Sequence, residues 1–554
     1  MTEPTDPTNP TGPTDPADPT EPADPRADRR WASIGHLFAD AVAEGGDREA
    51  LVDGGVVHTW ADLGTAVRRA AAAFLAAGVE PGDRVAIWAP NCVEWPIALF
   101  GLQSVGAVLV PLNTRYKGIE AADILDRSRA RVLVAADGFL GNDYVSMLDG
   151  HDLPHLRRLV AVRPEGDPHP RAQPWDDFLA SGDGVGDAAV AARLDAVGGD
   201  DTADLLFTSG TTGKPKGVIC THAQTLRAVG AWAAINGLRA DDRYLCVNPF
   251  FHSFGYKAGL VAWLETRCTL LPVPVFDVPE VMRLIAEQRA TVLPGAPTLY
   301  QSILNHPDRH RLDSSSLRLA VTGAAAVPVS LVAQMRDDLG FDTVVTAYGL
   351  TEASGFVSIC RPDDDDETIA ATSGRAMPGI EVRIVDGEGR DLPPGEAGEI
   401  VVRGYNVMRG YAEDPEATAE AIDAEGWLHT GDVGTLDERG YLDITDRIKD
   451  VFIVGGFNAY PAEIEDLLLR HPAIAQVAVI GVPDERLGEV GAAFVVPAAG
   501  HEVHEAEVVA WARANMANFK VPRHVRTVTS LPVNPSGKVL KYELRDAFRR
   551  TNPC

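Results

Sequence analysis

The chain has 554 residues, of which 45% are hydrophobic and 23% are charged, as in ordinary globular proteins. This length exceeds what one compact core accommodates, so we expect two or more domains. The formal net charge of −29 repels phosphate backbones and anionic lipid headgroups, which argues against nucleic-acid partners and against stable association with a membrane. An anionic small-molecule substrate would have to meet local positive charge.

Residues 1–30 are a tract of Pro, Thr, Asp and Glu, which predicts a disordered acidic tail. The tract holds eight prolines and seven acidic residues, and it has too little apolar surface to offset the entropy of ordering. It has neither the basic start nor the apolar centre of a signal peptide. The six cysteines are scattered without a C-x-x-C pair, which favours buried thiols in a reducing compartment. We therefore expect a cytoplasmic protein.

Strands and helices alternate along the first two thirds of the chain. Apolar residues at helical spacing predict a first helix over 34–42, followed by a strand at 84–88, an apolar helix through residue 102 and a strand at 107–111. Further strands are predicted at 131–134 and 203–207, and a second alternating series runs from 244 to about 347. This alternation predicts a mostly parallel sheet covered by helices.

The character of the sequence changes after residue 379. Short β-rich pieces with Gly and Pro turns over 379–402 predict a small antiparallel barrel or sheet. A second domain is predicted from about residue 446, with a helix at 461–470, strands at 477–482 and 492–496, and a helix at about 504–517. The acidic run at 363–367 predicts a solvated loop. The expected fold class is α/β: a large N-terminal domain of layered sheets and helices with a small β-barrel-like subdomain, then a small α+β C-terminal domain.

Residues 208–217 read Thr-Ser-Gly-Thr-Thr-Gly-Lys-Pro-Lys-Gly, a composition that indicates a phosphate-binding loop after the strand at 203–207. Glycines let backbone N–H groups turn toward an anion, hydroxyls add donors, and Lys214 and Lys216 add positive charge. The run is not a Walker A loop, because Pro215-Lys216 stands where that motif requires Gly-Lys. Taken alone, the run could also be a flexible surface loop.

Five further motifs follow in order: Asn-Pro-Phe-Phe-His-Ser-Phe-Gly at 248–255, Thr-Ala-Tyr-Gly-Leu-Thr-Glu at 346–352, Trp-Leu-His-Thr-Gly-Asp at 427–432, Asp-Arg-Ile-Lys-Asp at 446–450 and Asn-Pro-Ser-Gly-Lys at 534–538. Each alone has a structural explanation: Tyr348 could be a core aromatic, Asp432 a turn residue and Lys538 an exposed lysine. Together with 208–217, in this order and spacing, they resemble the adenylate-forming superfamily (acyl-CoA synthetases, luciferases, peptide-synthetase adenylation domains) over residues 31–550.

The resemblance implies an acid–thiol ligase with two steps. A carboxylic acid first reacts with ATP to give acyl-AMP and pyrophosphate, and the thiol of coenzyme A (CoA) then displaces AMP. It implies that 208–217 holds the β- and γ-phosphates, that Thr351 donates to the α-phosphate and that Glu352 holds Mg²⁺. Tyr348 would stack on adenine, while Asp432 and Arg447 would bind the ribose. The implied catalytic residues are Lys538, Glu352, Thr351 and His252, and the implied nucleotide and CoA positions are Thr208, Ser209, Gly210, Thr211, Thr212, Gly213, Lys216, Gly323, Ala324, Ala325, Ala347, Tyr348, Asp432, Arg447, Lys449, Gly455 and Gly456.

The same resemblance divides the chain into a tail at 1–30, a large adenylating domain at 31–446 and a small mobile domain at 447–554. Lys449 stands where the superfamily places its hinge. In one orientation the small domain would present Lys538 for adenylation, and in the other it would present Gly455-Gly456, which borders the tunnel for the pantetheine arm of CoA. The two glycines suit close approach of a ligand to the backbone.

The acyl pocket is expected to be lined by parts of 250–257, 295–300 and 323–327, with the segment around Tyr348 closing it and His252 as an aromatic gate. Phe251, Phe254 and Tyr256 make this neighbourhood bulky, which disfavours a long straight tunnel. Lys257 could pair with a polar group on the acid, but we expect it to point to solvent or to a surface acid. The runs at 248–259, 292–298 and 321–325 resemble one subgroup, the bacterial CoA ligases of steroid catabolism. These enzymes activate the bicyclic C/D-ring acid methylhydrindanone propanoate (HIP), and the likeness predicts HIP as the substrate, in sterol or cholesterol catabolism.

Three alternatives stay open. The first is a medium-chain or aryl acyl-CoA ligase, and the second is an adenylating enzyme that loads the pantetheine of a carrier protein. The third, a non-catalytic nucleotide-binding protein, is disfavoured because Lys538, Glu352 and Asp432 are all intact. The expected partners are thus a small carboxylic acid, ATP and CoA, and the sequence is compatible with a homo-oligomer.

Overall fold

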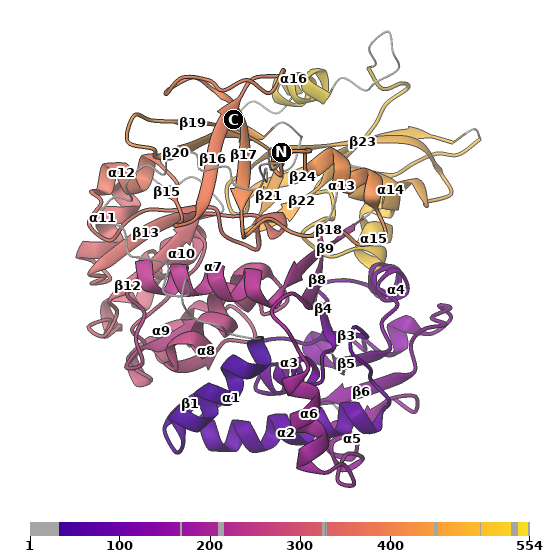
Figure 1. Cartoon of the computed structure of the whole chain (residues 1–554). Coiled ribbons are helices and arrows are strands. Elements are labelled where there is room, and N and C mark those ends of the chain that lie inside the picture. The colour runs from indigo at the N-terminus through magenta and orange to yellow at the C-terminus, as the bar shows by residue number, and fades with distance from the viewer. Residues whose placement is uncertain are drawn as a thin grey trace, which may run out of the picture.

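The computed structural model describes residues 33–164, 166, 169–208, 215–323, 327, 329–447, 452–498, 500–532 and 541–551. Figure 1 shows a large body that holds the indigo and magenta parts of the chain, with the yellow C-terminal part at its upper side. The large body has hydrophobic cores built from residues between Ile34 and Leu442, and the small body has its own core between Phe452 and Phe548. The predicted α/β fold with a large N-terminal and a small C-terminal domain is confirmed.

An eight-stranded sheet forms the centre of the N-terminal domain. Its strands are, in spatial order, β18 (Gly410–Tyr411), β9 (Lys216–Thr221), β8 (Thr202–Thr208), β4 (Val108–Pro111), β3 (Arg84–Trp88), β5 (Val132–Ala136), β6 (Arg158–Val162) and β7 (Gln173–Pro174). The strands pair in parallel except at β8–β9 and β9–β18. Val85 and Ile87 of β3 face one core, and Ala86 and Trp88 face another. Burial on both faces explains why these strands read as continuous apolar runs.

Helices cover both faces of this sheet. One layer contains α1 (Ile34–Gly45), α2 (Trp60–Ala76) and α3 (Glu94–Ser104), which share a core with Val85 and Ile87. The other contains α4 (Gly118–Arg127), whose apolar side packs with Trp88. The predicted first helix and the predicted strands at 84–88 and 203–207 lie within observed elements of the expected type, and those at 107–111 and 131–134 each begin one residue before the observed strand. The shorter helices α5 (Trp175–Ala180) and α6 (Asp187–Asp195) follow β7 in the chain.

A second layered unit combines strands from beyond residue 242 with β1 and β2 from near the start of the chain. Its strands form two four-stranded runs: β10 (Arg243–Cys246), β11 (Thr269–Pro272), β1 (Glu49–Asp53) and β2 (Val56–Thr59), then β12 (Leu319–Gly323), β13 (Thr343–Tyr348), β14 (Ser358–Ile359) and β15 (Arg375–Ala376). Bridges from Val292 to Tyr244 and to Leu319 join the two runs. The helices of this unit are α7 (His222–Ile235), a π-helix η3 (Phe254–Val261), α8 (Ala262–Thr266), α9 (Val278–Glu287), α10 (Pro297–Leu304), α11 (Val329–Asp337) and α12 (Asp366–Ala371). Part of the acidic run 363–367 does more than face solvent, because Asp365 caps the first turn of α12.

The predicted small antiparallel subdomain is a sheet rather than a closed barrel among the described residues. Its order is β16 (Ile380–Val385), β17 (Gly398–Gly404), β19 (Leu428–Leu436) and β20 (Leu442–Arg447), and every pair is antiparallel. The short helix α13 (Pro415–Ala421) lies between β18 and β19 in the chain. This sheet places the 427–432 motif and Arg447 on neighbouring strands, where Asp432 and Arg447 are partners in the ladder.

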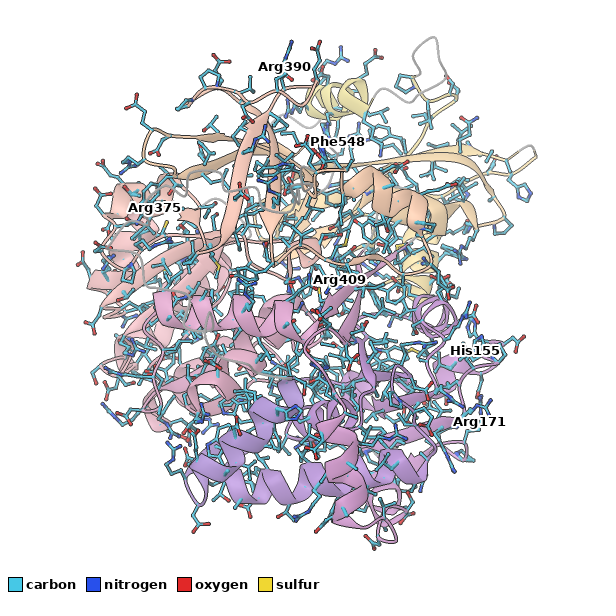
Figure 2. All side chains as sticks on the ribbon, in the orientation of Figure 1. His155, Arg171, Arg375, Arg390, Arg409 and Phe548 are labelled. Atoms are coloured by element: carbon cyan, nitrogen blue, oxygen red, sulfur yellow. The ribbon has the colours of Figure 1, made fainter. Side chains whose placement is uncertain are left out.

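The C-terminal domain is α+β. Its sheet contains β22 (Phe457–Ala459), β21 (Phe452–Val454), β24 (Gly488–Pro497) and β23 (Ile474–Asp484), with β25 (His524–Thr527) paired to β24. Helices α14 (Pro461–Leu469), α15 (Glu505–Asn515) and α16 (Lys541–Thr551) complete it. Phe548, labelled in Figure 2, packs against Arg526 and His524, which holds α16 on β25. Strands β23 and β24 are longer than predicted, because their pairing continues to Asp484 and Gly488 at the hairpin.

Two chain-wide expectations can be compared with the described residues. The five described cysteines are all free and buried, as the sequence predicted. Across the described ranges, no helix has the length and apolar character that crossing a bilayer requires.

Candidate active site

A cavity of about 1760 Å³ opens between the two domains and is lined by residues of the motifs at 208–217, 248–255, 346–352 and 427–432. The N-terminal domain supplies most of its wall, including the strand ends at Thr208, Gly323 and Tyr348. The C-terminal domain closes one side with residues that include Gly455 and Gly456. Residues of the N-terminal and the C-terminal domain therefore line the same cavity.

Strands β8 and β9 deliver the two ends of the expected phosphate loop to this cavity. Thr208, the last residue of β8, donates from its hydroxyl to Oε1 of Glu352 at 3.0 Å. Lys216, the first residue of β9, lies with its ammonium 5.0 Å from the centre of the Tyr411 ring. The intervening predicted residues, Ser209, Gly210, Thr211, Thr212 and Gly213, lie outside the described residues.

Glu352 sits on a short 3₁₀ turn, η5 (Thr351–Ala353), beside Thr351. Its Oε1 also accepts a hydrogen bond of 3.1 Å from the hydroxyl of Tyr411 on β18. Burial raises the pKa of the Glu352 carboxyl, although the two hydroxyls oppose this effect. The sequence reasoning did not single out Tyr411, because it lies outside all six motifs and reaches Glu352 only through the pairing of β18 with β9.

Tyr348 and Asp432 meet across the cavity wall. The Tyr348 hydroxyl donates to Oδ2 of Asp432 at 2.6 Å. Gly431, with φ of 71°, makes the turn in β19 that presents Asp432, and the backbone N–H of Asp432 donates to the Thr430 hydroxyl at 3.1 Å. Arg447 lies opposite Asp432 in the backbone ladder.

Gly323 and Ala347 are neighbours on paired strands beside this contact. A Cβ at Gly323 would come within 2.5 Å of the Ala347 carbonyl oxygen, so a glycine is required there. Both residues line the cavity, while the predicted neighbours Ala324 and Ala325 lie outside the described residues.

His252 lines the cavity ahead of the π-helix η3. Its Nδ1 accepts a hydrogen bond of 3.2 Å from the backbone N–H of Phe254, so in the neutral ring Nε2 carries the proton. The side chain is exposed to the cavity, yet the protein groups around it partly desolvate the ring, which lowers the pKa of His252 and favours that neutral form. Gly255 is needed in the same turn, because a Cβ there would lie 2.1 Å from the Pro249 carbonyl oxygen.

The predicted aromatic crowding is only partly correct. Phe251 and Phe254 line the cavity, but Tyr256 is fully buried on the other side of η3. Its hydroxyl accepts a hydrogen bond of 3.1 Å from Nε2 of Gln103 on α3. Tyr256 thus contributes to the core behind the pocket rather than to its wall.

The prediction that Lys257 points to solvent or to a surface acid is wrong. Lys257 is fully buried, and its Nζ lies 3.5 Å from Oδ1 of Asp204, which is also fully buried. Asp204 belongs to β8, four residues before Thr208 at the phosphate loop. Residues 255–261 of η3 are all buried, so Lys257 has no solvent-facing side of this helix to occupy.

Gly455 and Gly456 form the turn between β21 and β22, with φ of 55° and 86°. A Cβ on Gly456 would lie 3.8 Å from the Ala296 side chain of the N-terminal domain. The turn therefore lies against the N-terminal domain at the cavity. Lys449 and Lys538 lie outside the described residues, as does the side chain of Arg447.

Comparisons with known proteins agree with this architecture. The family model of the AMP-binding enzyme matches residues 38–412, and that of the AMP-binding enzyme C-terminal domain matches residues 463–538. The chain therefore belongs to the AMP-binding enzyme family, and it is an acyl-CoA ligase.

Two curated relatives carry the same name, 3-[(3aS,4S,7aS)-7a-methyl-1,5-dioxo-octahydro-1H-inden-4-yl]propanoyl:CoA ligase. The chain is 53% identical to the one from Rhodococcus jostii, over 91% of this chain and 97% of the relative. It is 54% identical to the one from Mycobacterium tuberculosis, over 90% and 96%. A solved structure of an o-succinylbenzoate CoA synthetase double mutant from Bacillus subtilis, bound to its product analogue, matches 92% of this chain and 98% of its own at 28% identity, with a TM-score of 0.76.

Proposed function

We propose that this ligase activates a methyl-dioxo-octahydroindenyl propanoate of the HIP type, the C/D-ring fragment of a steroid, as its CoA thioester. The observation that carries the proposal is the identity of 53% and 54%, over nearly the whole chain, with two ligases named for that acid. The bulky wall formed by Phe251 and Phe254 also supports it, because such a wall suits a compact acid. A rigid bicycle has fewer rotatable bonds to immobilise on binding than a flexible chain, so its binding costs less conformational entropy.

The reaction joins two steps in one cavity. A carboxylate oxygen of the acid bonds to the α-phosphorus of ATP, and the bond to pyrophosphate breaks. The CoA sulfur then bonds to the acyl carbon of acyl-AMP, its proton is lost, and AMP leaves with the electrons of the acyl–oxygen bond. The first step brings a carboxylate against a polyanion, so cations and N–H donors must offset the repulsion.

The residues that the motifs single out suit this task. Thr208 and Lys216, with the loop between them, would hold the β- and γ-phosphates, and Thr351 would donate to the α-phosphate. Tyr348 would stack on adenine beside Gly323 and Ala347. Asp432 would accept from the ribose hydroxyls with help from Arg447. Lys538 would reach the substrate carboxylate, and neutral His252 would gate the acyl pocket.

Glu352 fits the requirement for Mg²⁺. A single carboxylate is enough for this ion, which keeps waters and phosphate oxygens in its shell. Both described hydroxyl donors contact Oε1, and Oε2 is the oxygen that we expect to reach the metal. Bound there, Mg²⁺ would offset the charge of the ATP phosphates, while Thr208 and Tyr411 keep the carboxylate in place.

The position of Gly455-Gly456 on the cavity supports a domain rearrangement between the steps. In the described arrangement this turn borders the cavity, as the second step would require. Rotation of residues 447–554 about Lys449 would bring Lys538 to the cavity for the first step. The enzyme would work in the cytoplasm, where ATP and CoA are available.

A substrate panel tests the proposal. The purified protein is given ATP, Mg²⁺ and CoA with HIP, octanoate, palmitate or a cinnamate, and kcat/KM is measured for each. We expect AMP and pyrophosphate as products, and a kcat/KM for HIP about ten-fold or more above that for the other acids. Preference for palmitate or the cinnamate would overturn the substrate, and ADP with phosphate would overturn the reaction.

A further inference from the structure

A buried cluster of three charges crosses the boundary between the domains. Lys520, between α15 and β25, lies with its Nζ 2.7 Å from Oε1 of Glu120 on α4 of the N-terminal domain. The same ammonium also donates to Oε1 of Glu463 on α14 of the C-terminal domain. The three side chains are 2%, 5% and 6% exposed. None of them belongs to a motif that the function has used so far.

Burial makes these charges depend on one another. Each ion loses its water, and it is stable there only while opposite charge and hydrogen bonds replace that water. Burial alone would lower the pKa of Lys520, but Glu120 and Glu463 outweigh it and raise the pKa, so Lys520 stays charged. The Tyr116 ring, 4.6 Å from the ammonium, adds a cation–π contact from the N-terminal domain.

Glu120 also has a hydrogen-bond partner in its own domain, which holds its side chain independently of Lys520. Its Oε2 accepts a hydrogen bond of 3.0 Å from the backbone N–H of Lys117 at the start of α4. Its Oε1 is thereby directed at the domain boundary. Neighbours on the same segment contact the C-terminal domain too: the Arg115 guanidinium lies 4.9 Å from the centre of the Phe457 ring, and Tyr116 and Ile119 pack on the C-terminal core.

The two ion pairs respond differently to a domain rotation. Lys520 and Glu463 belong to one domain and move together, so their contact survives. Lys520 and Glu120 belong to different domains, so their contact exists only in the described orientation. This is the orientation in which Gly455-Gly456 borders the cavity.

We infer that Glu120 and Lys520 are positioning residues for the thioester-forming step: their ion pair docks the C-terminal domain in the orientation that presents Gly455-Gly456. The inference rests on the proposed rearrangement between the two steps. Loss of the pair disfavours this orientation alone. Thioester formation therefore slows, while acyl-AMP formation, which uses the other orientation, does not.

The test measures the half-reactions separately in the full-length protein. Pyrophosphate exchange into ATP, without CoA, reports acyl-AMP formation, and presynthesised acyl-AMP with CoA reports thioester formation. Glu120→Gln removes the charge but keeps an oxygen for the Lys117 N–H. We expect about ten-fold or greater loss in thioester formation, as for one charged hydrogen bond, with exchange within about two-fold of the unmodified protein. Glu120→Lys, which places like charges together, should lose more.

Matched variants separate docking from general damage. Asp126→Asn removes an exposed carboxylate from the same helix, α4, and should leave both half-reactions unchanged. Lys520→Arg keeps the charge and should retain more thioester formation than Lys520→Met. Because both half-reactions are measured on one preparation, a partly unfolded variant lowers both equally and leaves their ratio unchanged.

Contrary results can be assigned separately to the inference, to the domain rearrangement or to the proposed function. Equal losses in the two half-reactions for Glu120→Gln, or no loss of thioester formation, would overturn the inference. The reciprocal variant Lys538→Ala should lose acyl-AMP formation and keep thioester formation, and its failure to do so would count against the rearrangement itself. Absence of both half-reactions in the unmodified protein would count against the proposed function instead.

Discussion

The Tyr348 hydroxyl at the end of β13 donates a hydrogen bond of 2.6 Å to Asp432 on β19. The two residues come from separate motifs, and their contact joins the second layered unit to the small antiparallel sheet. It fixes the plane of the Tyr348 ring and the orientation of the carboxylate. We expect adenine to lie on that ring and the ribose hydroxyls to reach that carboxylate.

Because of this contact, we expect two substitutions of Tyr348 to raise the KM for ATP by different amounts. Tyr348→Phe keeps the stacking surface and loses the hydrogen bond, which should raise the KM for ATP by about ten-fold, as for one charged hydrogen bond. Tyr348→Ala also loses the ring and should raise it further. The KM for ATP in pyrophosphate exchange gives both values. Equal KM values for the two variants would show that the ring does not contribute.

The role proposed for Glu352 predicts that its substitution changes the Mg²⁺ requirement of acyl-AMP formation. Glu352→Gln should lower acyl-AMP formation by roughly 100-fold or more, because a charge directed at the reacting phosphates is lost. It should also raise the Mg²⁺ concentration that gives half-maximal rate. Tyr411→Phe, which removes one of the two hydroxyls on Oε1, should act in the same direction and less strongly.

The control for Glu352 is Glu420→Gln, which neutralises an exposed carboxylate at the rim of the same cavity. It should leave the Mg²⁺ dependence unchanged. The role assigned to Glu352 would be wrong if both substitutions shifted that dependence alike.

Local sequence predicted most of the elements and part of the cavity wall, because buried strands and glycine turns have local signatures. Thr208, Glu352, Tyr348 and Asp432 meet at one site as their motifs suggested. The pairing of Tyr348 with Asp432 was not predicted, since it depends on how two sheets are placed. Their proposed roles remain predictions for the variants above.

The missed features depend on contacts between distant segments. Lys520 and Glu120 are 400 residues apart, and neither lies in a pattern that suggests a partner. Lys257 follows an aromatic run that predicts a pocket wall, yet it lies on a helix segment that is buried on all sides and contacts Asp204. Helix register and domain docking decide these orientations, and neither is encoded in a short window of sequence.

The buried pair of Lys257 and Asp204 predicts a strong and non-additive effect on stability. Lys257→Met should lower the free energy of unfolding by about 3–5 kcal/mol, because a carboxylate is left buried without its cation. Lys257→Met combined with Asp204→Leu should recover most of that loss. Chemical denaturation of the single and double variants measures the coupling. Additive losses would show that the two groups do not stabilise one another.

Protonation of His222, at the start of α7, is expected to make the stability of the folded protein depend on pH. The side chain is buried, and its Nδ1 accepts a hydrogen bond of 3.3 Å from the backbone N–H of Ile34 at the start of α1. Burial lowers the pKa of His222 from 6.5 to about 4, despite nearby Asp201. The unfolded chain therefore binds a proton at a higher pH than the folded one does. Stability from the neutral ring is fully present above pH 6.5 and is lost as the pH falls toward 4.

The expected loss over that interval is about 3 kcal/mol, from 1.36 kcal/mol for each pKa unit. His222→Asn keeps an acceptor near the Ile34 N–H and cannot take up a proton, so its unfolding free energy should fall less steeply between pH 6.5 and 4. His155→Asn is the control, because His155 lies exposed at the edge of the molecule (Figure 2) and should leave the slope unchanged. Urea denaturation at half-unit pH steps measures the slopes. Equal slopes for His222→Asn and the unmodified protein would show that a different group binds the destabilising proton.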